Sequence, residues 1–238
     1  MRIGLATFEF KNRDILFNLS QIERGVKEAS GKVDLLCFGE AFLQGFDSLC
    51  WEFEADKRIA IEQDSERMNS VCKLSKKYGL DLIFGYIERE DDRLYSSCAV
   101  IEKGCLSYNY RRISRGWKEY LLTDDHYKEG DDVVEFIYKG NSIMLAICGD
   151  MWDYLEMYKT NGLIIWPVFL NFTLEEWEQV YEVDYAQQAL LCADRVLMIN
   201  SISHETEPGG IGGSFYFING MIKEKAEYGK ESILIVEV

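Results

Sequence analysis

Cys148 stands at a point where the chain is predicted to leave a strand and enter a helix. It follows the apolar run 143–147 and precedes Gly149, where a helix is expected to begin. Open α/β sheets place their sites at such strand ends. The positive field of a helix N-terminus lowers the pKa of a thiol and stabilises an oxyanion. Cys148 is therefore a candidate nucleophile; the alternative is a cysteine that only packs at a strand end.

Charged side chains follow two other predicted strands. Glu40 comes directly after the apolar segment 34–39, where partial burial would raise the pKa of a carboxyl group toward the range of a general base. The segment 111–119 offers several cations and a carboxylate. The alternative for both is a solvated loop, where glutamates and runs of charge usually lie.

A cysteine–histidine pair is the other arrangement that could activate a thiol. His126 lies in a long loop and His204 follows a predicted strand, and neither stands in a recognisable local motif. We expect both to be exposed loop residues. A Cys–His peptidase would require one of them to be essential.

The elements that position these residues alternate between the periodicity of strands and that of helices. The predicted strands are 2–7, 33–38, 82–87, 95–102, 106–111, 133–138, 142–147, 162–166, 196–201, 213–218 and 232–238, and the predicted helices are 13–29, 62–78, 150–159 and 174–194. This order indicates an α/β fold with helices layered on sheets. The aromatic loop 112–131 is long enough to be functional. No linker interrupts the pattern, so we expect one domain, 1–238.

Composition excludes several classes of function. The formal net charge of −15 disfavours binding to nucleic acid or to an anionic membrane surface. No apolar run approaches the roughly 18 residues of a membrane span, and the N-terminus does not resemble a secretory signal. Seven cysteines without a CxxC pair argue against a disulfide framework and a structural zinc site. We therefore expect a cytoplasmic protein.

In their order along the chain, these motifs resemble those of the carbon–nitrogen hydrolase (nitrilase) superfamily. The matching segments are Phe38–Phe46 around Glu40, Tyr110–Arg112, Glu119, His126–Asp131, Ile147–Asp150 around Cys148, the helix near Asp184–Arg195, Asn200–Ser201 and Gly212–Ser214. Each is weak alone, and the resemblance covers essentially the whole chain. It implies a four-layer αββα sandwich that commonly forms a homodimer and needs no metal or cofactor.

The resemblance also implies roles for individual residues. Glu40 would be the base, Cys148 the nucleophile that forms a thioester, Gly149 a backbone oxyanion donor and Glu119 the second glutamate of the family. The implied substrate is a small linear amide or an N-carbamoyl compound. Residues expected to line its pocket, by analogy with the family layout, are Phe46, Trp117, Tyr120, Trp152 and Asn171.

One position departs from the family pattern, because its catalytic lysine falls on Arg112. Arginine stays protonated, so it can stabilise an oxyanion but cannot shuttle a proton. Three interpretations follow. Either Lys118 supplies the ammonium group, or Arg112 serves electrostatically, or the protein is a weak or inactive relative that binds a small molecule as a regulatory protein.

Overall fold

The computed structural model describes residues 1–238, whose strands form two six-stranded mixed sheets. The first sheet has the order β12-β1-β2-β3-β4-β5 and the second the order β11-β10-β9-β8-β7-β6. The strands of the first are β1 (Arg2–Thr7), β2 (Leu35–Cys37), β3 (Asp81–Glu90), β4 (Arg93–Glu102), β5 (Cys105–Arg111) and β12 (Ser232–Glu237). Those of the second are β6 (Glu135–Tyr138), β7 (Asn141–Leu145), β8 (Leu163–Val168), β9 (Arg195–Asn200), β10 (Phe215–Ile218) and β11 (Met221–Lys225).

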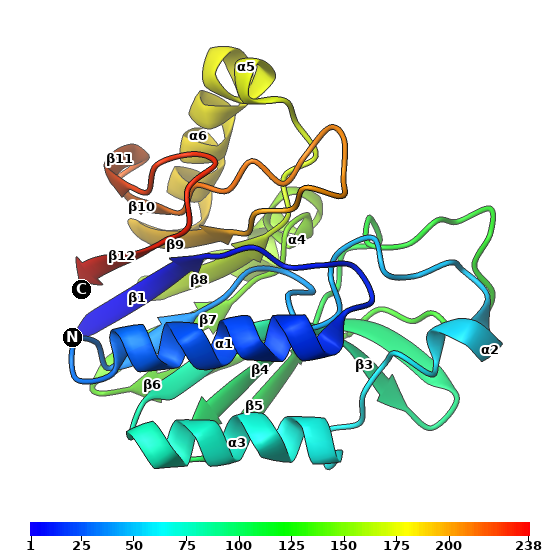
Figure 1. The fold of residues 1–238 in the computed structure, drawn as a ribbon. Coiled ribbons are helices and arrows are strands. Elements are labelled where there is room, and N and C mark those ends of the chain that lie inside the picture. The colour runs from blue at the N-terminus through cyan, green and yellow to red at the C-terminus, as the bar shows by residue number, and fades with distance from the viewer.

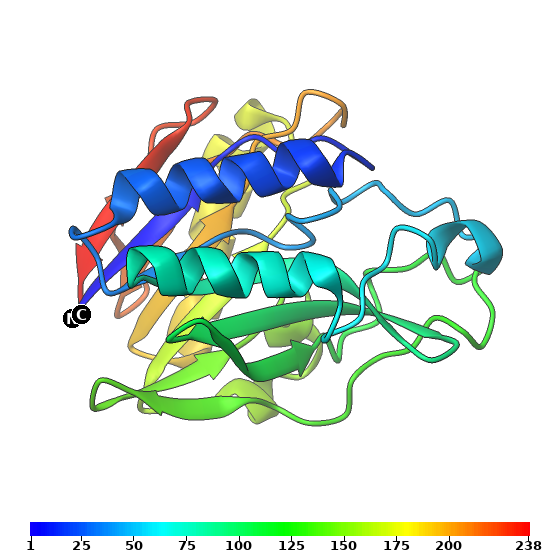
Figure 2. The ribbon, with the colours of Figure 1, turned by 60° about the horizontal axis from the view of Figure 1, so that its bottom comes forward.

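Helices cover the outer face of each sheet, which makes the molecule a four-layer αββα sandwich, as predicted (Figure 1). The helices α1 (Ile15–Ala29) and α3 (Glu66–Tyr78) lie side by side on the first sheet (Figure 2). The helix α6 (Glu182–Cys192) packs on β9, β10 and β11, with α4 (Asp150–Asp153) beside it. No helix combines the length and the apolar character that a membrane span needs.

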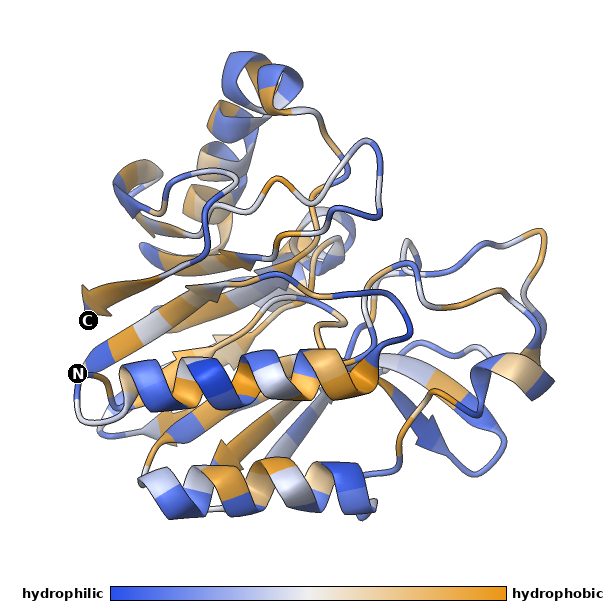
Figure 3. Ribbon diagram, viewed as in Figure 1, coloured by the Kyte–Doolittle hydropathy of each residue, from blue (hydrophilic) through white to orange (hydrophobic).

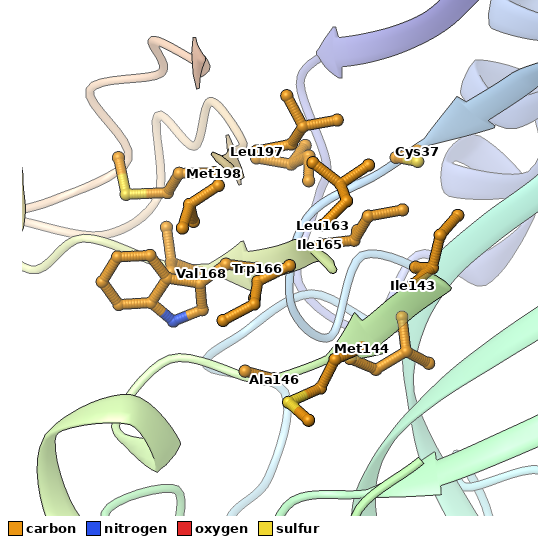
Figure 4. Close-up of a cluster of buried hydrophobic side chains, with 14 of the residues drawn as sticks. Cys37, Ile143, Met144, Ala146, Leu163, Ile165, Trp166, Val168, Leu197 and Met198 are labelled. Carbon is orange, nitrogen blue, oxygen red and sulfur yellow. The ribbon is translucent and has the colours of Figure 1, made fainter. Parts of the chain in front are cut away.

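The main hydrophobic core lies between the two sheets. Alternate residues of β2 point to its two faces: Leu35 and Cys37 enter this core, whereas Leu36 packs under the helices of the first sheet. Cys37 faces residues of β7, β8 and β9 across the sandwich (Figure 4). Central strands buried on both faces read as continuous apolar runs, and orange runs through the inner strands in Figure 3.

Helix boundaries follow from local capping. Asp14 accepts a hydrogen bond from the backbone N–H of Phe17 at 3.0 Å, and Ser65 accepts one from Met68 at 3.3 Å. The helix α3 ends at Gly79, whose φ of +61° is a left-handed conformation that glycine adopts without strain.

Four elements differ from the sequence-based expectation. The predicted helix 174–194 consists of α5 (Leu174–Glu176), a π-helical turn (Trp177–Tyr181) and α6. The predicted helix 150–159 divides into α4 and a 3-10 turn (Leu155–Tyr158). The short helix α2 (Phe53–Asp56) and strand β11 were not predicted. β11 alternates between exposed and half-buried residues, so it lacks an apolar signal.

The two ends of the chain lie together at the edge of the first sheet. β12 pairs antiparallel with β1 over six residue pairs, from Arg2–Glu237 to Thr7–Ser232. The amino group of Met1 donates a hydrogen bond to the carbonyl oxygen of Val238 at 2.9 Å. The labels N and C are adjacent in Figures 1 and 2.

Candidate active site

Glu40, Arg112 and Cys148 lie together where strands of both sheets end. Glu40 and Cys148 each follow the last residue of a parallel strand by three positions, β2 in one sheet and β7 in the other. Arg112 directly follows β5. Its Nη1 donates a hydrogen bond to Oε1 of Glu40 at 2.7 Å, and this ion pair is almost completely buried. Cys148 and Glu40 each shift the pKa of the other, which places the thiol beside the carboxylate.

Close backbone packing fixes the turn that carries Glu40. The N–H of Gly85 in β3 donates to the carbonyl oxygen of Gly39 at 3.1 Å. A β-carbon at position 85 would lie 2.8 Å from the Cα of Glu40, so only glycine lets β3 approach so closely. Ala41 has a φ of +47°, an uncommon value for a residue with a side chain. The strand and turn therefore hold the carboxylate in one place.

The backbone of Cys148 is strained and anchored. Its φ is +43°, a left-handed conformation that a non-glycine residue adopts at a cost. Its N–H donates to the carbonyl oxygen of Pro167 at 3.0 Å, and its own carbonyl accepts from the indole Nε1 of Trp166 at 2.8 Å. Both anchors belong to β8, so the neighbouring strand sets the position of the sulfur.

Burial governs the protonation state of Glu40. Desolvation raises the pKa of this carboxyl group, the nearby charge of Asp150 acts in the same direction, and Arg112 opposes both. Oε1 is bound by Arg112, whereas Oε2 is buried without a hydrogen-bond partner. A buried carboxylate with a raised pKa and one unoccupied oxygen is suited to accept and return a proton.

The thiol of Cys148 is protonated at neutral pH. Burial, followed by the negative charge of Glu40, raises the pKa of Cys148 to about 12. The charge of Arg112 and a hydrogen bond from the backbone N–H of Phe169 act to lower it. To react as a nucleophile, this thiol would need a base, and Glu40 is next to it.

Arg112 is held from two sides. Its Nε donates to Oγ of Ser114 at 2.7 Å, and its Nη1 binds Glu40. Burial alone would lower the pKa of Arg112, but the charges of Glu40, Cys148 and Asp150 outweigh it and raise that pKa. A β-carbon built on Gly149 would lie 2.8 Å from Nη2, so glycine lets the guanidinium group approach the residue after Cys148.

Asp150 ties the segment after β5 to the end of β7. It is fully buried and accepts backbone hydrogen bonds from Ile113, Ser114 and Ile147 at 3.0, 2.7 and 2.8 Å. The hydroxyl of Tyr110 donates to its second oxygen. The sequence analysis included Asp150 in the cysteine motif without a role. The sequence feature that could have indicated a role is an acidic side chain close after the apolar run 143–147.

Four predicted site residues lie away from this group. Lys118 pairs with Glu129 at 2.7 Å and donates to the carbonyl oxygen of Tyr127 at 2.6 Å. The side chains of Glu119, Tyr120 and Asn171 are exposed and make no hydrogen bond within the protein. All three belong to surface segments, whereas the buried group is built at strand ends.

The predicted aromatic residues are buried to different degrees. Trp117 is buried against Ala41, the neighbour of Glu40, and its Nε1 has no partner. Phe46 stacks on Phe169 with 4.5 Å between ring centroids. Trp152 is more exposed and packs edge-on against Tyr185 at 5.2 Å.

Tyr185 is a site residue that the sequence analysis missed. Its ring stacks on Trp166, the indole that binds the carbonyl of Cys148, with 5.2 Å between centroids. Burial raises the pKa of Tyr185, and the charges of Cys148 and Glu40 raise it further. A π-helical turn (Trp177–Tyr181) precedes α6, the helix that carries Tyr185. No local motif in the sequence marks such a turn.

The two histidines stand apart from Cys148. His126 binds Asp124 at 2.9 Å and stacks on Phe53 with 3.8 Å between centroids, and His204 is exposed. No group of three histidine, cysteine or acidic side chains is arranged to hold a metal ion. The buried group at the strand ends consists of a thiol, a carboxylate and a guanidinium group.

Residues 2–186 match the family described as carbon-nitrogen hydrolase. The chain belongs to this family. A probable nitrilase of Schizosaccharomyces pombe is 26% identical over 184 residues, which cover 72% of this chain and 62% of that protein. An (R)-stereoselective amidase of Pseudomonas sp. is 22% identical over 63% of this chain and 52% of its own length. The matches thus span roughly half to three-fifths of these relatives.

Solved structures with the same fold cover nearly the whole chain. A CN-hydrolase superfamily protein from Xanthomonas campestris, with an arsenic adduct in its active site, has a TM-score of 0.79 at 16% identity; the match covers 99% of this chain and 89% of that one. An amidase from Nesterenkonia sp. has a TM-score of 0.76 at 16% identity, with 100% and 90% covered. One variant of that amidase carries acrylamide, added to its active-site cysteine.

Proposed function

We propose that this carbon–nitrogen hydrolase cleaves a small linear amide or an N-carbamoyl compound through a thioester at Cys148. The observation that carries the proposal is the buried group of Glu40, Arg112 and Cys148. It combines a nucleophile, an adjacent base with one free oxygen and a permanent cation, which are the parts that acyl transfer requires. Amidases among its relatives support the same class of substrate.

Acylation begins with a proton transfer from the thiol of Cys148 to Oε2 of Glu40. The sulfur attacks the carbonyl carbon, and the carbonyl oxygen becomes an oxyanion. Glu40 then returns the proton to the substrate nitrogen, the carbon–nitrogen bond breaks, and ammonia or an amine leaves. The acyl group remains on the sulfur as a thioester.

Deacylation reverses the roles. Glu40 takes a proton from a water molecule, whose oxygen attacks the thioester carbon. The tetrahedral intermediate collapses, the carbon–sulfur bond breaks, and Glu40 returns the proton to the sulfur. The product is a carboxylic acid or, from an N-carbamoyl compound, a carbamic acid. All proton transfers pass through Glu40, because an arginine cannot take part in them.

In this proposal Arg112, rather than Lys118, stabilises the oxyanion together with the N–H of Gly149. Arg112 lies beside Gly149, whereas the ammonium group of Lys118 is occupied by Glu129 and the carbonyl of Tyr127. We accordingly expect Lys118→Ala to retain turnover within a few-fold. Arg112→Gln should lose about 10²–10³-fold, the usual cost of removing one oxyanion donor. The reverse result would return the role to Lys118.

Pocket residues can be proposed on the same basis. Trp117, Phe46 and Trp152 supply aromatic surface near the buried group, and Tyr185 adds a hydroxyl that makes no hydrogen bond in the protein. These side chains suit a small, partly apolar substrate. Glu119, Tyr120 and Asn171 would reach such a substrate only if their exposed segments moved inward.

The test is ammonia release from a panel of small amides, N-carbamoyl amines and nitriles, with Cys148→Ala in parallel. Release by the natural protein that vanishes in the variant supports the proposal, and the part of the panel that reacts names the substrate class. A thioester trapped by hydroxylamine would identify the intermediate. Release that persists in Cys148→Ala would exclude Cys148 as the nucleophile.

A second candidate function is a binding or regulatory protein with little activity. The observation in its favour is Arg112 itself, a cation that cannot exchange protons, next to a thiol whose pKa is raised to about 12. The two functions differ in the reactivity of the thiol. An enzyme should alkylate faster at Cys148 than at the exposed Cys50 and Cys105, which serve as references within the same chain. Slower alkylation at Cys148, with no turnover, favours the binding protein.

We also propose a homodimer. Val183, Leu190 and Leu191 are about half exposed on α6, and a second copy would cover these apolar side chains. Light scattering measures the mass directly. Replacing Leu190 and Leu191 by serine should then yield a monomer of 27.6 kDa.

A further inference from the structure

The guanidinium group of Arg112 has three nitrogens with three different surroundings. Nε donates to Oγ of Ser114 and Nη1 donates to Oε1 of Glu40, both at 2.7 Å. Nη2 makes no hydrogen bond within the protein and lies beside Gly149. The group is therefore fixed on two sides and free on the side next to the nucleophile.

We infer that Ser114 is a positioning residue, which fixes the guanidinium group of Arg112 so that Nη2 faces the developing oxyanion. This inference rests on the proposed function. A planar fork that is held only through Nη1 can rotate about that contact. A second contact at Nε defines the plane of the fork, and with it the direction in which Nη2 points.

Ser114 is itself held rigidly. It is fully buried, and its N–H donates to Oδ1 of Asp150 at 2.7 Å. The same carboxylate binds the N–H of Ile147, the residue before the nucleophile, at 2.8 Å. The serine that holds the cation and the strand end that carries Cys148 therefore share one anchor, so their relative position is set within a single network.

The chemistry of the hydroxyl group suits this task. A β-carbon built on Gly149 would lie 3.1 Å from Oγ of Ser114, so the glycine at position 149 lets this hydroxyl group approach the residue after Cys148. A hydroxyl oxygen accepts the Nε–H bond without carrying charge. A carboxylate in its place would neutralise the cation that the oxyanion needs.

A double-mutant cycle of Ser114→Ala and Arg112→Lys tests the inference. With Arg112 present, we expect Ser114→Ala to lower kcat about 10- to 100-fold, the cost of a small misplacement, with KM within about twofold. A lysine ammonium has no second nitrogen for Ser114 to fix, so in the Arg112→Lys background the loss should be less than about threefold. Equal losses in both backgrounds, or no loss beside Arg112, would overturn the inference.

Alkylation of Cys148 by iodoacetamide provides a readout that does not need turnover. Arg112 lowers the pKa of the thiol, so a guanidinium group that swings away should move the alkylation profile to higher pH. Ser114→Ala should produce this shift beside Arg112 and none beside Arg112→Lys. A shift without any amide hydrolysis by the natural protein would refute the proposed function while the positioning role stands. An unchanged profile in an active enzyme would refute the positioning role.

A third variant distinguishes the loss of the hydrogen bond from a loss of side-chain packing. Ser114→Cys nearly keeps the shape of serine but replaces its oxygen with a weaker acceptor. It should fold with a thermal midpoint near that of the natural protein and lie between serine and alanine in kcat. If Ser114→Cys matches the natural protein while Ser114→Ala does not, the side chain only fills space.

Discussion

Arg111 and Arg112 are consecutive, and each pairs with a buried glutamate of its own. Arg111 binds both oxygens of Glu88, with Nη2–Oε1 at 2.6 Å and Nε–Oε2 at 3.0 Å. Arg112 reaches only one oxygen of Glu40. Consecutive residues of an extended chain point to opposite faces, so the two ion pairs lie in different surroundings.

The two carboxylates differ in how fully they are bound. Glu88 also accepts hydrogen bonds from Gln63, Ser97 and Asn109, and these donors with Arg111 outweigh burial and lower its pKa. Glu40 keeps one buried oxygen free, and burial raises its pKa. A saturated carboxylate is a structural anchor, whereas an unsaturated one remains available for proton transfer.

The largest expected effect is at Glu40. Glu40→Gln keeps the shape of the side chain but cannot accept a proton, so kcat/KM should fall about 10²–10⁴-fold. The thermal midpoint should also fall, because the buried guanidinium group of Arg112 would keep only a neutral amide as its partner. A variant that unfolds but retains full activity per folded molecule would assign Glu40 the structural role.

Glu88→Gln should lower stability but leave activity nearly unchanged. The variant leaves Arg111 and the other donors without their shared carboxylate, which should lower the free energy of unfolding by about 2–3 kcal/mol. Urea denaturation measures this loss. We expect kcat/KM to stay within about threefold, and a collapse of activity in a folded variant would break the distinction between the two glutamates.

The pH dependence of kcat/KM should follow Glu40 alone. Only ionised Glu40 accepts a proton, so activity falls as the pH drops through its pKa. Because burial raises that pKa, the acid limb should have its midpoint above the roughly 4.3 of an ordinary glutamate. Glu88→Gln serves as the matched control and should leave the midpoint unchanged.

The smallest expected effect is that of one donor to Glu88. Ser97→Ala removes a single hydrogen bond from a carboxylate that keeps its arginine, so the loss should be about 1 kcal/mol in the free energy of unfolding. Denaturant titration can detect it. If the free energy of unfolding fell as much as in Glu88→Gln, the stabilising effect would not be distributed among the donors to Glu88.

The sequence predicts the site best where a reactive residue directly follows a buried strand. Glu40 and Cys148 were predicted because each directly follows an apolar segment, 34–39 for Glu40 and 143–147 for Cys148. The resemblance to the family placed them in one site, since no local pattern shows that the two sheets face each other. The family comparison and the fold confirm that resemblance.

Local sequence patterns could not predict the contacts that long side chains make. The sequence left Arg112 and Lys118 as equal candidates because both are cations in one segment. Burial separates them: Arg112 lies between two sheets, and Lys118 lies in a loop that supplies its own carboxylate, Glu129. Nothing in the sequence indicated a role for Ser114, because serine is a common residue in polar loops. Its contact depends on a fold that brings Arg112, Asp150 and Gly149 together.

The pairing of β1 with β12 has a consequence for engineering. Because Met1 and Val238 are hydrogen-bonded neighbours, a linker of a few residues would join them and close the chain into a ring. The ring can be reopened in an exposed turn, such as Lys103–Gly104 between β4 and β5, to give a circular permutant with the same sheets. β1 runs parallel to β2, so the joined ends lie at the opposite end of the sheet from Glu40. New sequence inserted there would lie at the end of the sheet opposite Glu40.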